Sequence, residues 1–207
     1  MFNLKMKRLN YKSTILICLI SIAICLPSNI YGFSECKEVQ KFEGELSFGF
    51  TTPIGAFHAG SPEISLLLGL ELRRNIKNTP FDAGIMLQLS GASRGNFNHG
   101  QKPYRQNNRT LAFAPTFHYN FQQGHKINPF AGCAVGIAHN DVVGNVVYPG
   151  SYTSLIFAPR FGVEFFHFLR ISGEFNVTRK GYHNFALYLG LVLGGRAKKQ
   201  KYDDYSM

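Results

Sequence analysis

The sequence predicts an all-β protein, an eight-stranded antiparallel up-and-down transmembrane β-barrel. From Leu155 to Leu193, large apolar residues alternate with small, polar or charged ones, and β-strands place side chains on two faces with that period. The connections between the expected strands tend to alternate between long and short, as in barrels with long external loops and short periplasmic turns. The N-terminus has the layout of an export signal. These observations favour a membrane barrel over a soluble β-protein.

Residues 1–32 are predicted to be a signal peptide. The basic residues that open it are Lys5, Lys7, Arg8 and Lys12. They precede an apolar run over 15–26, the order found in secretory signals. That run is too short for a membrane-spanning helix, which needs about 20 residues. Cleavage is expected after Gly32, with Ser28 as the alternative, and a lipid anchor on Cys25 is the competing interpretation.

The remaining chain divides into a polar lead at 33–42, the barrel at 43–195 and a polar C-terminal tail at 196–207. Runs that alternate with period two, and are expected to be strands, lie at 45–51, 64–73, 81–90, 110–121, 131–138, 154–165, 169–178 and 184–194. Longer connections are expected at 52–63, 91–108 and 139–151, and shorter ones at 74–80, 122–128, around 166 and at 179–182. Many of the connections contain Gly, Pro or Asn, which favour turns and loops.

Each expected strand has one large apolar face that carries no charge in its middle. In a membrane barrel this face contacts lipid, and the small or charged face fills the lumen. The residues predicted to contact lipid include Leu66, Leu68, Leu70, Leu187, Leu189 and Leu191. Eight strands leave an interior that side chains fill, so a wide channel is excluded.

Proline and glycine mark local departures from an ideal sheet. Pro115 and Pro159 lie in the middle of expected strands, where proline removes a ladder hydrogen bond, so we expect a bulge or kink at each. Two G-x-x-x-G pairs, which on strands share one face, are expected to leave room for large side chains opposite. These pairs are Gly132 with Gly136 and Gly190 with Gly194.

Residues 43–196 resemble the small eight-stranded outer-membrane β-barrels typified by the OmpA membrane domain and OmpX. The resemblance rests on the strand pattern, on P-F-A-G-C-A-V-G from Pro129 and on the final strand F-A-L-Y-L-G-L-V-L-G-G. It implies the outer membrane of a Gram-negative-type bacterium, contact with outer-membrane lipid and glycolipid, and insertion by the barrel-assembly machinery. Many such barrels end in a C-terminal Phe, whereas here a tail follows Gly195, so the assembly signal is left open.

The hairpin of the sixth and seventh expected strands predicts charge pairs in the lumen. A tight connection at 166–168 makes the numbers of facing residues add up to about 334, which places Arg160 opposite Glu174 and Glu164 opposite Arg170. Residues from across the narrow lumen are expected to join them. The predicted lumen cluster is Arg160, Glu164, Arg170, Glu174, Glu71 and Arg73, and it is expected to block conduction.

Basic residues lie in or beside two connections that are expected to be external. They are Arg94, Lys102, Arg105, Arg109, Arg179 and Lys180. Solvated polar loops are one interpretation, and contact with the phosphates of outer-leaflet glycolipid is the sharper one. The connection at 91–108 is expected to be mobile. Although the formal net charge is +10, the charges do not gather on one element and the chain is predicted to be exported, so no nucleic-acid partner is expected.

The sequence predicts no catalytic, cofactor or metal site. The G-A-S-R-G segment at 91–95 matches a nucleophile elbow, but no helical period follows it, as that motif requires. The seven histidines show no spacing typical of metal ligands. Cys36 and Cys133 are interpreted as unrelated thiols.

Three functional hypotheses follow. The first is a non-enzymatic outer-membrane barrel with a structural role or a surface partner bound by its external loops. The second is an outer-leaflet enzyme that modifies lipid acyl chains, which would need a Ser or His cluster at the external rim. The third is a soluble lipocalin-like carrier, which would need the apolar faces to point inward.

Overall fold

A computed structural model describes residues 39–54, 61–99, 102–143, 150–178 and 182–194. The predicted signal peptide and C-terminal tail lie outside these residues, as do Arg179 and Lys180. Over the described ranges, no helix is long and apolar enough to cross a bilayer.

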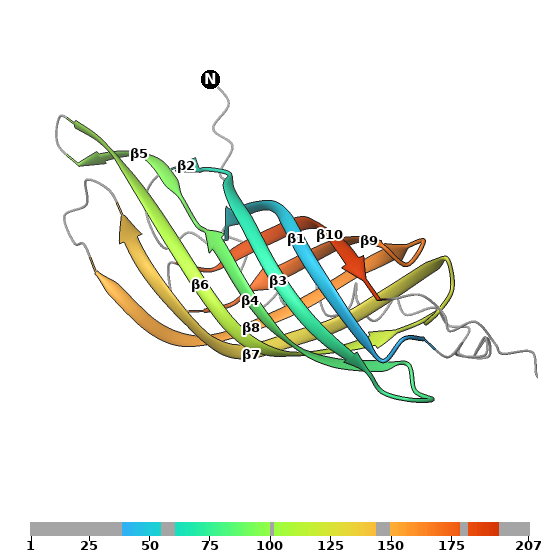
Figure 1. The fold of residues 1–207 in the computed structure, drawn as a ribbon. Helices are drawn as coiled ribbons and strands as arrows, with labels where there is room; N and C mark the ends of the chain where they lie inside the picture. Colours follow the sequence, from blue (N-terminus) through green and yellow to red (C-terminus); the bar gives the residue numbers. More distant parts are fainter. Residues whose placement is uncertain (1–38, 55–60, 100–101, 144–149, 179–181, 195–207) are drawn as a thin grey trace, which may run out of the picture. The chain divides into compact units, whose positions relative to one another are not determined.

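Eight strands form a closed antiparallel ring, shown in Figure 1. Each strand of the ring pairs with the ring strands before and after it in the chain, and the first pairs with the last, from Gly44 opposite Leu193 to Pro53 opposite Asn184. This is the predicted up-and-down barrel. Its strands are β1 (Phe42–Pro53), β3 (Ser65–Asn75), β4 (Phe81–Gly91), β6 (Lys102–Asn120), β7 (Ile127–Val143), β8 (Ser151–Phe165), β9 (Leu169–Asn176) and β10 (Asn184–Leu193).

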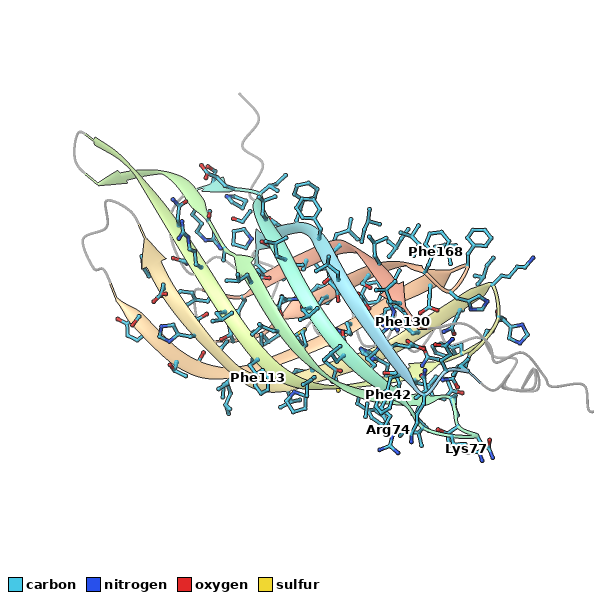
Figure 2. All side chains as sticks on the ribbon, viewed as in Figure 1. Phe42, Arg74, Lys77, Phe113, Phe130 and Phe168 are labelled. Carbon is cyan, nitrogen blue, oxygen red and sulfur yellow. The ribbon has the colours of Figure 1, made fainter. Side chains whose placement is uncertain are left out.

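The barrel is apolar outside and polar inside. Leu68 of β3 is 53% exposed, whereas Glu71 of the same strand is 4% exposed. All the leucines predicted to contact lipid are about half exposed, and Figure 2 shows Phe113 and Phe168 directed away from the barrel wall. The predicted assignment of faces is therefore confirmed. The soluble-carrier hypothesis is wrong, because it needs the apolar faces inside.

Aromatic side chains gather on the outer surface near one end of the barrel. We call it the short-turn end, since it is formed by the turns at 76–80, 121–126 and 166–168; the opposite end is the long-loop end. The Phe81 ring lies 5.2 Å from that of Phe117 and 5.3 Å from that of Tyr119. Aromatic girdles of this kind are typical of the membrane interface in transmembrane barrels.

The predicted loop at 91–108 is largely a β-hairpin, so that prediction is wrong. The short strand β5 (Arg94–His99) pairs with the first part of β6 and also with β2 (Ser61–Pro62). The Gly- and Asn-rich sequence resembles a loop, but pairing satisfies the backbone N–H and C=O groups. A register shift between Arg94 and Phe97 marks an irregularity in the hairpin. The loop expected from His139 likewise starts later, because β7 extends to Val143.

The two mid-strand prolines do not shift the register, so neither forms a bulge, the first of the two distortions expected there. Pro159 pairs with Cys133 in an unbroken β7–β8 ladder, and Pro115 pairs with Ile85 in the β4–β6 ladder. The β6–β7 ladder has a gap at Ala114 and Pro115 but resumes in the same register. A proline lacks one N–H donor, and the ladder absorbs this loss without an extra residue.

A tight turn at the short-turn end sets the register of β8 and β9. Phe166 and His167 have positive φ angles of 51° and 64°, and the Phe168 N–H donates to the Phe165 carbonyl over 3.2 Å. Phe165 then faces Leu169, and Arg160 faces Glu174. This is the register predicted from the charges.

Candidate functional site

The lumen has three layers. At the long-loop end, polar side chains bridge neighbouring strands: Thr110 donates to Asn140 Oδ1 over 2.8 Å, and Asn176 donates to Asn184 Oδ1 over 3.0 Å. In the middle, the side of the lumen formed by β4, β6, β7 and β8 is apolar and consists mainly of Met86, Ala112, Ala114, Ala134, Ala138, Ile156 and Ala158. The layer toward the short-turn end is charged. We call it the lumen charge cluster; it comprises Glu43, Glu45, Glu71, Arg73, Asp82, His118, Arg160, Glu164, Arg170 and Glu174, all buried.

Arg160 joins three strands across the lumen. From β8, its Nη1 donates to Glu71 Oε2 of β3 over 2.5 Å. Its Nε and Nη2 both donate to Glu174 Oε2 of β9, over 2.9 and 2.5 Å. Hydrogen bonds between charged groups are the stronger ones, particularly where water is excluded. The bridge therefore ties opposite sides of the ring together.

Arg73 and Arg170 share one carboxylate. Arg73 Nη1 donates to Glu45 Oε2 over 2.5 Å, and Arg170 Nη1 donates to the same oxygen over 3.1 Å. Arg73 Nη2 also donates to Glu43 Oε2 over 3.1 Å. The Arg170 guanidinium carbon lies 3.6 Å from the centre of the Phe130 ring, a cation–π contact.

One predicted ion pair is not formed. Glu164 lies opposite Arg170 in the β8–β9 ladder, as predicted. Arg170 nevertheless directs its guanidinium to Glu45 and to the Phe130 ring. Contacts across the lumen have replaced the contact along the ladder, because Arg170 is long enough to reach the first strand. Of the six residues predicted to form the lumen cluster, Glu71, Arg73, Arg160, Arg170 and Glu174 take part in ion pairs, and Glu164 does not within the described part of the chain.

The sequence prediction missed a buried histidine–aspartate pair. His118 Nδ1 lies 2.8 Å from Asp82 Oδ1, and Asn120 donates to Asp82 Oδ2 over 2.7 Å. The signal was available, because Asp82 and His118 lie on the polar faces of strands that neighbour each other in the barrel, and they face each other in the β4–β6 ladder. Glu43 and Glu45 were also missed, although Glu43 faces its partner Arg73 in the β1–β3 ladder. The second partner of Glu45, Arg170, lies on β9, which is remote in sequence.

Glycines in the wall make room for these charged groups. A side chain at Gly132 would meet His118, and one at Gly190 would meet the Glu45 carboxylate. This confirms the prediction of space for large opposing side chains at these two glycines. Gly136 instead allows a close approach to the backbone of β6, and Gly194 has a φ of 106° at the end of the last strand.

The residues predicted to contact glycolipid differ in their exposure to the surroundings of the barrel. Arg94 is 5% exposed, so its place among the outward contacts is wrong. Arg109 is exposed on β6, opposite Asp141 of β7. Lys102 and Arg105 belong to the first part of β6, but their side chains are outside the description, as are Arg179 and Lys180 entirely.

The nucleophile-elbow motif has no elbow geometry. Ser93 accepts a hydrogen bond from Ser65 Oγ over 2.9 Å, and strand β5 follows where a nucleophile elbow needs a helix. A different group lies on the outer rim near the long-loop end. His139 Nδ1 lies 3.0 Å from Thr153 Oγ1, and its Nε2 lies 3.3 Å from Asp141 Oδ1.

The closed ring, the apolar outer surface and the charged lumen define a small eight-stranded transmembrane β-barrel. No protein-family model and no curated protein matches the chain. The assignment to this class therefore rests on the strand pairing of this chain, on its apolar outer surface and on its polar lumen.

Several solved outer-membrane barrels have a similar shape. Neisserial surface protein A is 8% identical, with a TM-score of 0.48 over 74% of this chain and 96% of that one. The N-terminal β-barrel domain of Pseudomonas aeruginosa OprF is 12% identical, with a TM-score of 0.47 over 75% and 100%. Ail, the attachment invasion locus protein of Yersinia pestis, was solved with the heparin analogue sucrose octasulfate. It is 12% identical, with a TM-score of 0.45 over 74% and 99%.

Proposed function

We propose that this chain is a non-enzymatic barrel of the bacterial outer membrane, with a structural or surface-interaction role exerted at its long-loop end. The observation that carries the proposal is the Arg160 bridge from β8 to Glu71 of β3 and Glu174 of β9. Side chains that meet across the lumen leave no wide passage through it. The long-loop end is assigned to the cell exterior, and insertion is assigned to the barrel-assembly machinery.

Conductance in planar bilayers tests the lumen. The wild-type barrel is expected to give no sustained current steps under conditions where a general porin, reconstituted in parallel, conducts. Replacing Arg160 and Glu71 together by alanine removes the bridge and is expected to allow brief openings. Stable large steps from the wild-type protein would overturn the proposal.

The partner proposed for the long-loop end is the outer-leaflet glycolipid. Arg109 lies on the outer face of β6, two residues closer to the long-loop end than the exposed Leu111. It is therefore near the edge of the apolar surface at the long-loop end. Arginine binds phosphate groups well, because its planar guanidinium donates several hydrogen bonds. Lys102, Arg105, Arg179 and Lys180 are proposed to add to this contact.

Titration of the detergent-solubilised barrel with anionic glycolipid tests this partner. Arg109→Gln is expected to lower affinity by about threefold at low salt, and high salt is expected to lower wild-type affinity as well. Arg74→Gln, an exposed arginine near the short-turn end, is the matched control and is expected to bind as the wild type does. Equal losses in both variants, or none in either, would contradict the glycolipid contact.

One observation favours a second candidate, an outer-leaflet lipid hydrolase. Thr153, His139 and Asp141 form a row of hydroxyl, imidazole and carboxylate on the outer face, the groups used to activate a nucleophile. The sequence alone did not assemble them. Release of fatty acid from phospholipid micelles, abolished by Thr153→Val, would support this candidate. No release by the wild-type protein would leave the row as a polar part of the rim.

A further inference from the structure

A small pocket lies in the barrel at the short-turn end. Its oxygen-bearing lining residues are Glu43, Asn75, Asn120, Gln123, Asn128 and Glu164. They come from five strands and from the turn between β6 and β7, and all are buried. The free space is about that of one water molecule. A space of that size also suits a single dehydrated cation.

Glu164 lines this pocket without a partner of its own. It is 5% exposed, and across the described ranges no hydrogen bond or ion pair joins its carboxylate. Arg170, its neighbour in the ladder, is held by Glu45 and by the Phe130 ring. A buried carboxylate without a partner is costly, so the arrangement calls for a cation or a proton at this point.

Buried carboxylates outnumber buried cations in the lumen charge cluster. The carboxylates are Glu43, Glu45, Glu71, Asp82, Glu164 and Glu174, and the guanidinium groups are those of Arg73, Arg160 and Arg170. A charged His118 would still leave an excess of two acids. Unpaired charge is expensive inside a barrel surrounded by lipid. One divalent cation would balance the excess.

The lining has the chemistry of a calcium site. Asn128 Nδ2 donates to Asn120 Oδ1 over 3.1 Å, and Asn128 Oδ1 accepts from the Gln122 backbone N–H over 3.1 Å. Each of these amide oxygens has a second lone pair. Carboxylate and amide oxygens are the ligands that Ca²⁺ takes, in flexible geometry, whereas Mg²⁺ demands a near-ideal octahedron and keeps several waters. Where the chain is described, no three His, Cys, Asp or Glu side chains form a metal site, so amide oxygens would complete the coordination.

We infer that the barrel binds one Ca²⁺ ion in this pocket, between the carboxylates of Glu43 and Glu164. The amide oxygens of Asn120 and Asn128 supply further ligands. The ion neutralises the lumen charge cluster and connects β1, β6, β7 and β8 at the short-turn end. The inference does not depend on the surface role proposed above.

Calorimetric titration and thermal unfolding test the site. The protein is refolded in a zwitterionic detergent, which does not itself attract Ca²⁺ as an anionic lipid would, and is stripped with a chelator. It is then titrated with Ca²⁺ or Mg²⁺ up to about 10 mM, above the weakest range typical of exported calcium modules. The wild-type barrel is expected to bind one Ca²⁺, to prefer it over Mg²⁺ and to unfold at a higher temperature when loaded.

Two carboxylate-to-amide variants locate the ion. Glu164→Gln is expected to weaken Ca²⁺ binding by about tenfold or more, since charge count sets affinity, and to abolish the thermal shift. Glu63→Gln makes the same chemical change near the long-loop end and is expected to leave both unchanged. Should Glu164→Gln fail to fold, Asn128→Ala keeps both carboxylates and is expected to weaken binding by about threefold.

Two outcomes would overturn the inference. Wild-type protein that binds no Ca²⁺ would show that a proton balances Glu164, and infrared spectra would then contain a protonated carboxyl band that Glu164→Gln removes. Calcium binding that survives both Glu164→Gln and Asn128→Ala would show that the ion is bound elsewhere.

Discussion

Arg160 and Glu174 face each other in the β8–β9 ladder, and two nitrogens of the guanidinium donate to one carboxylate oxygen, over 2.9 and 2.5 Å. Breaking a buried pair by removing one partner costs about 3–5 kcal/mol, whereas replacing both partners by apolar residues is often neutral. Arg160→Met is therefore expected to lower the free energy of unfolding by several kcal/mol. Adding Glu174→Met should restore part of that loss. Urea unfolding in lipid vesicles measures both, and a double variant less stable than Arg160→Met would contradict the pairing.

The depth of the apolar surface can be measured by arginine substitution. Leu68→Arg places a charge on the lipid face near the middle of β3 and is expected to cost about 2–4 kcal/mol. Leu193→Arg makes the same change at the last residue of β10, which is 78% exposed, and is expected to cost about 0–1 kcal/mol. Unfolding in bilayers of defined thickness provides the comparison. Equal costs at the two positions would show that Leu68 does not lie near the bilayer midplane.

A methyl group at Gly132 tests how closely the wall is packed against the cluster. Gly132→Ala would bring a Cβ against His118 and the backbone oxygen of Phe117, so it is expected to cost about 1–3 kcal/mol by overpacking. Gly44→Ala is the control, because its Cβ would meet only Leu72 Cδ2 at 3.6 Å, an ordinary contact. Thermal unfolding in detergent is the measurement. Equal stability of the two variants would indicate that His118 does not fill the space at Gly132.

The protruding hairpin is expected to be dispensable for barrel formation. The β4–β6 ladder begins at Gly91 opposite Arg109, and the β6–β7 ladder begins at Asn107. Residues 95–105 therefore take no part in the ladders of the ring. Replacing residues 95–105 by Asn-Gly puts a two-residue turn between the facing residues Arg94 and Gln106, and should preserve heat-modifiable migration on gels and leave stability within about 1 kcal/mol. Loss of the folded band would show that the hairpin helps the ring to close.

The sequence was informative where a short period controls the structure. Alternation along strands such as 64–73 assigns lipid and lumen faces, because the side-chain period is fixed at two. The opposite charges of Arg160 and Glu174, which lie on two strands connected by a tight turn, predict the register of β8 and β9. The pairing of β5 with β6 was not predictable in this way, since Gly- and Asn-rich segments form loops and hairpins alike. The Arg170–Glu45 contact could not be predicted from the sequence either, because it depends on how far the strands are staggered around the ring.

The β1–β10 ladder has a consequence for how the chain folds. It joins Gly44 to Leu193, whereas each other ladder of the ring joins strands that follow one another along the chain. Until β10 arrives, β1 and β9 present open edges, and a bilayer offers their backbone groups no hydrogen-bond partners. A sheet that lacks β10 therefore cannot close, and its two edge strands keep unpaired N–H and C=O groups. Closure of the ring thus depends on the last strand of the barrel.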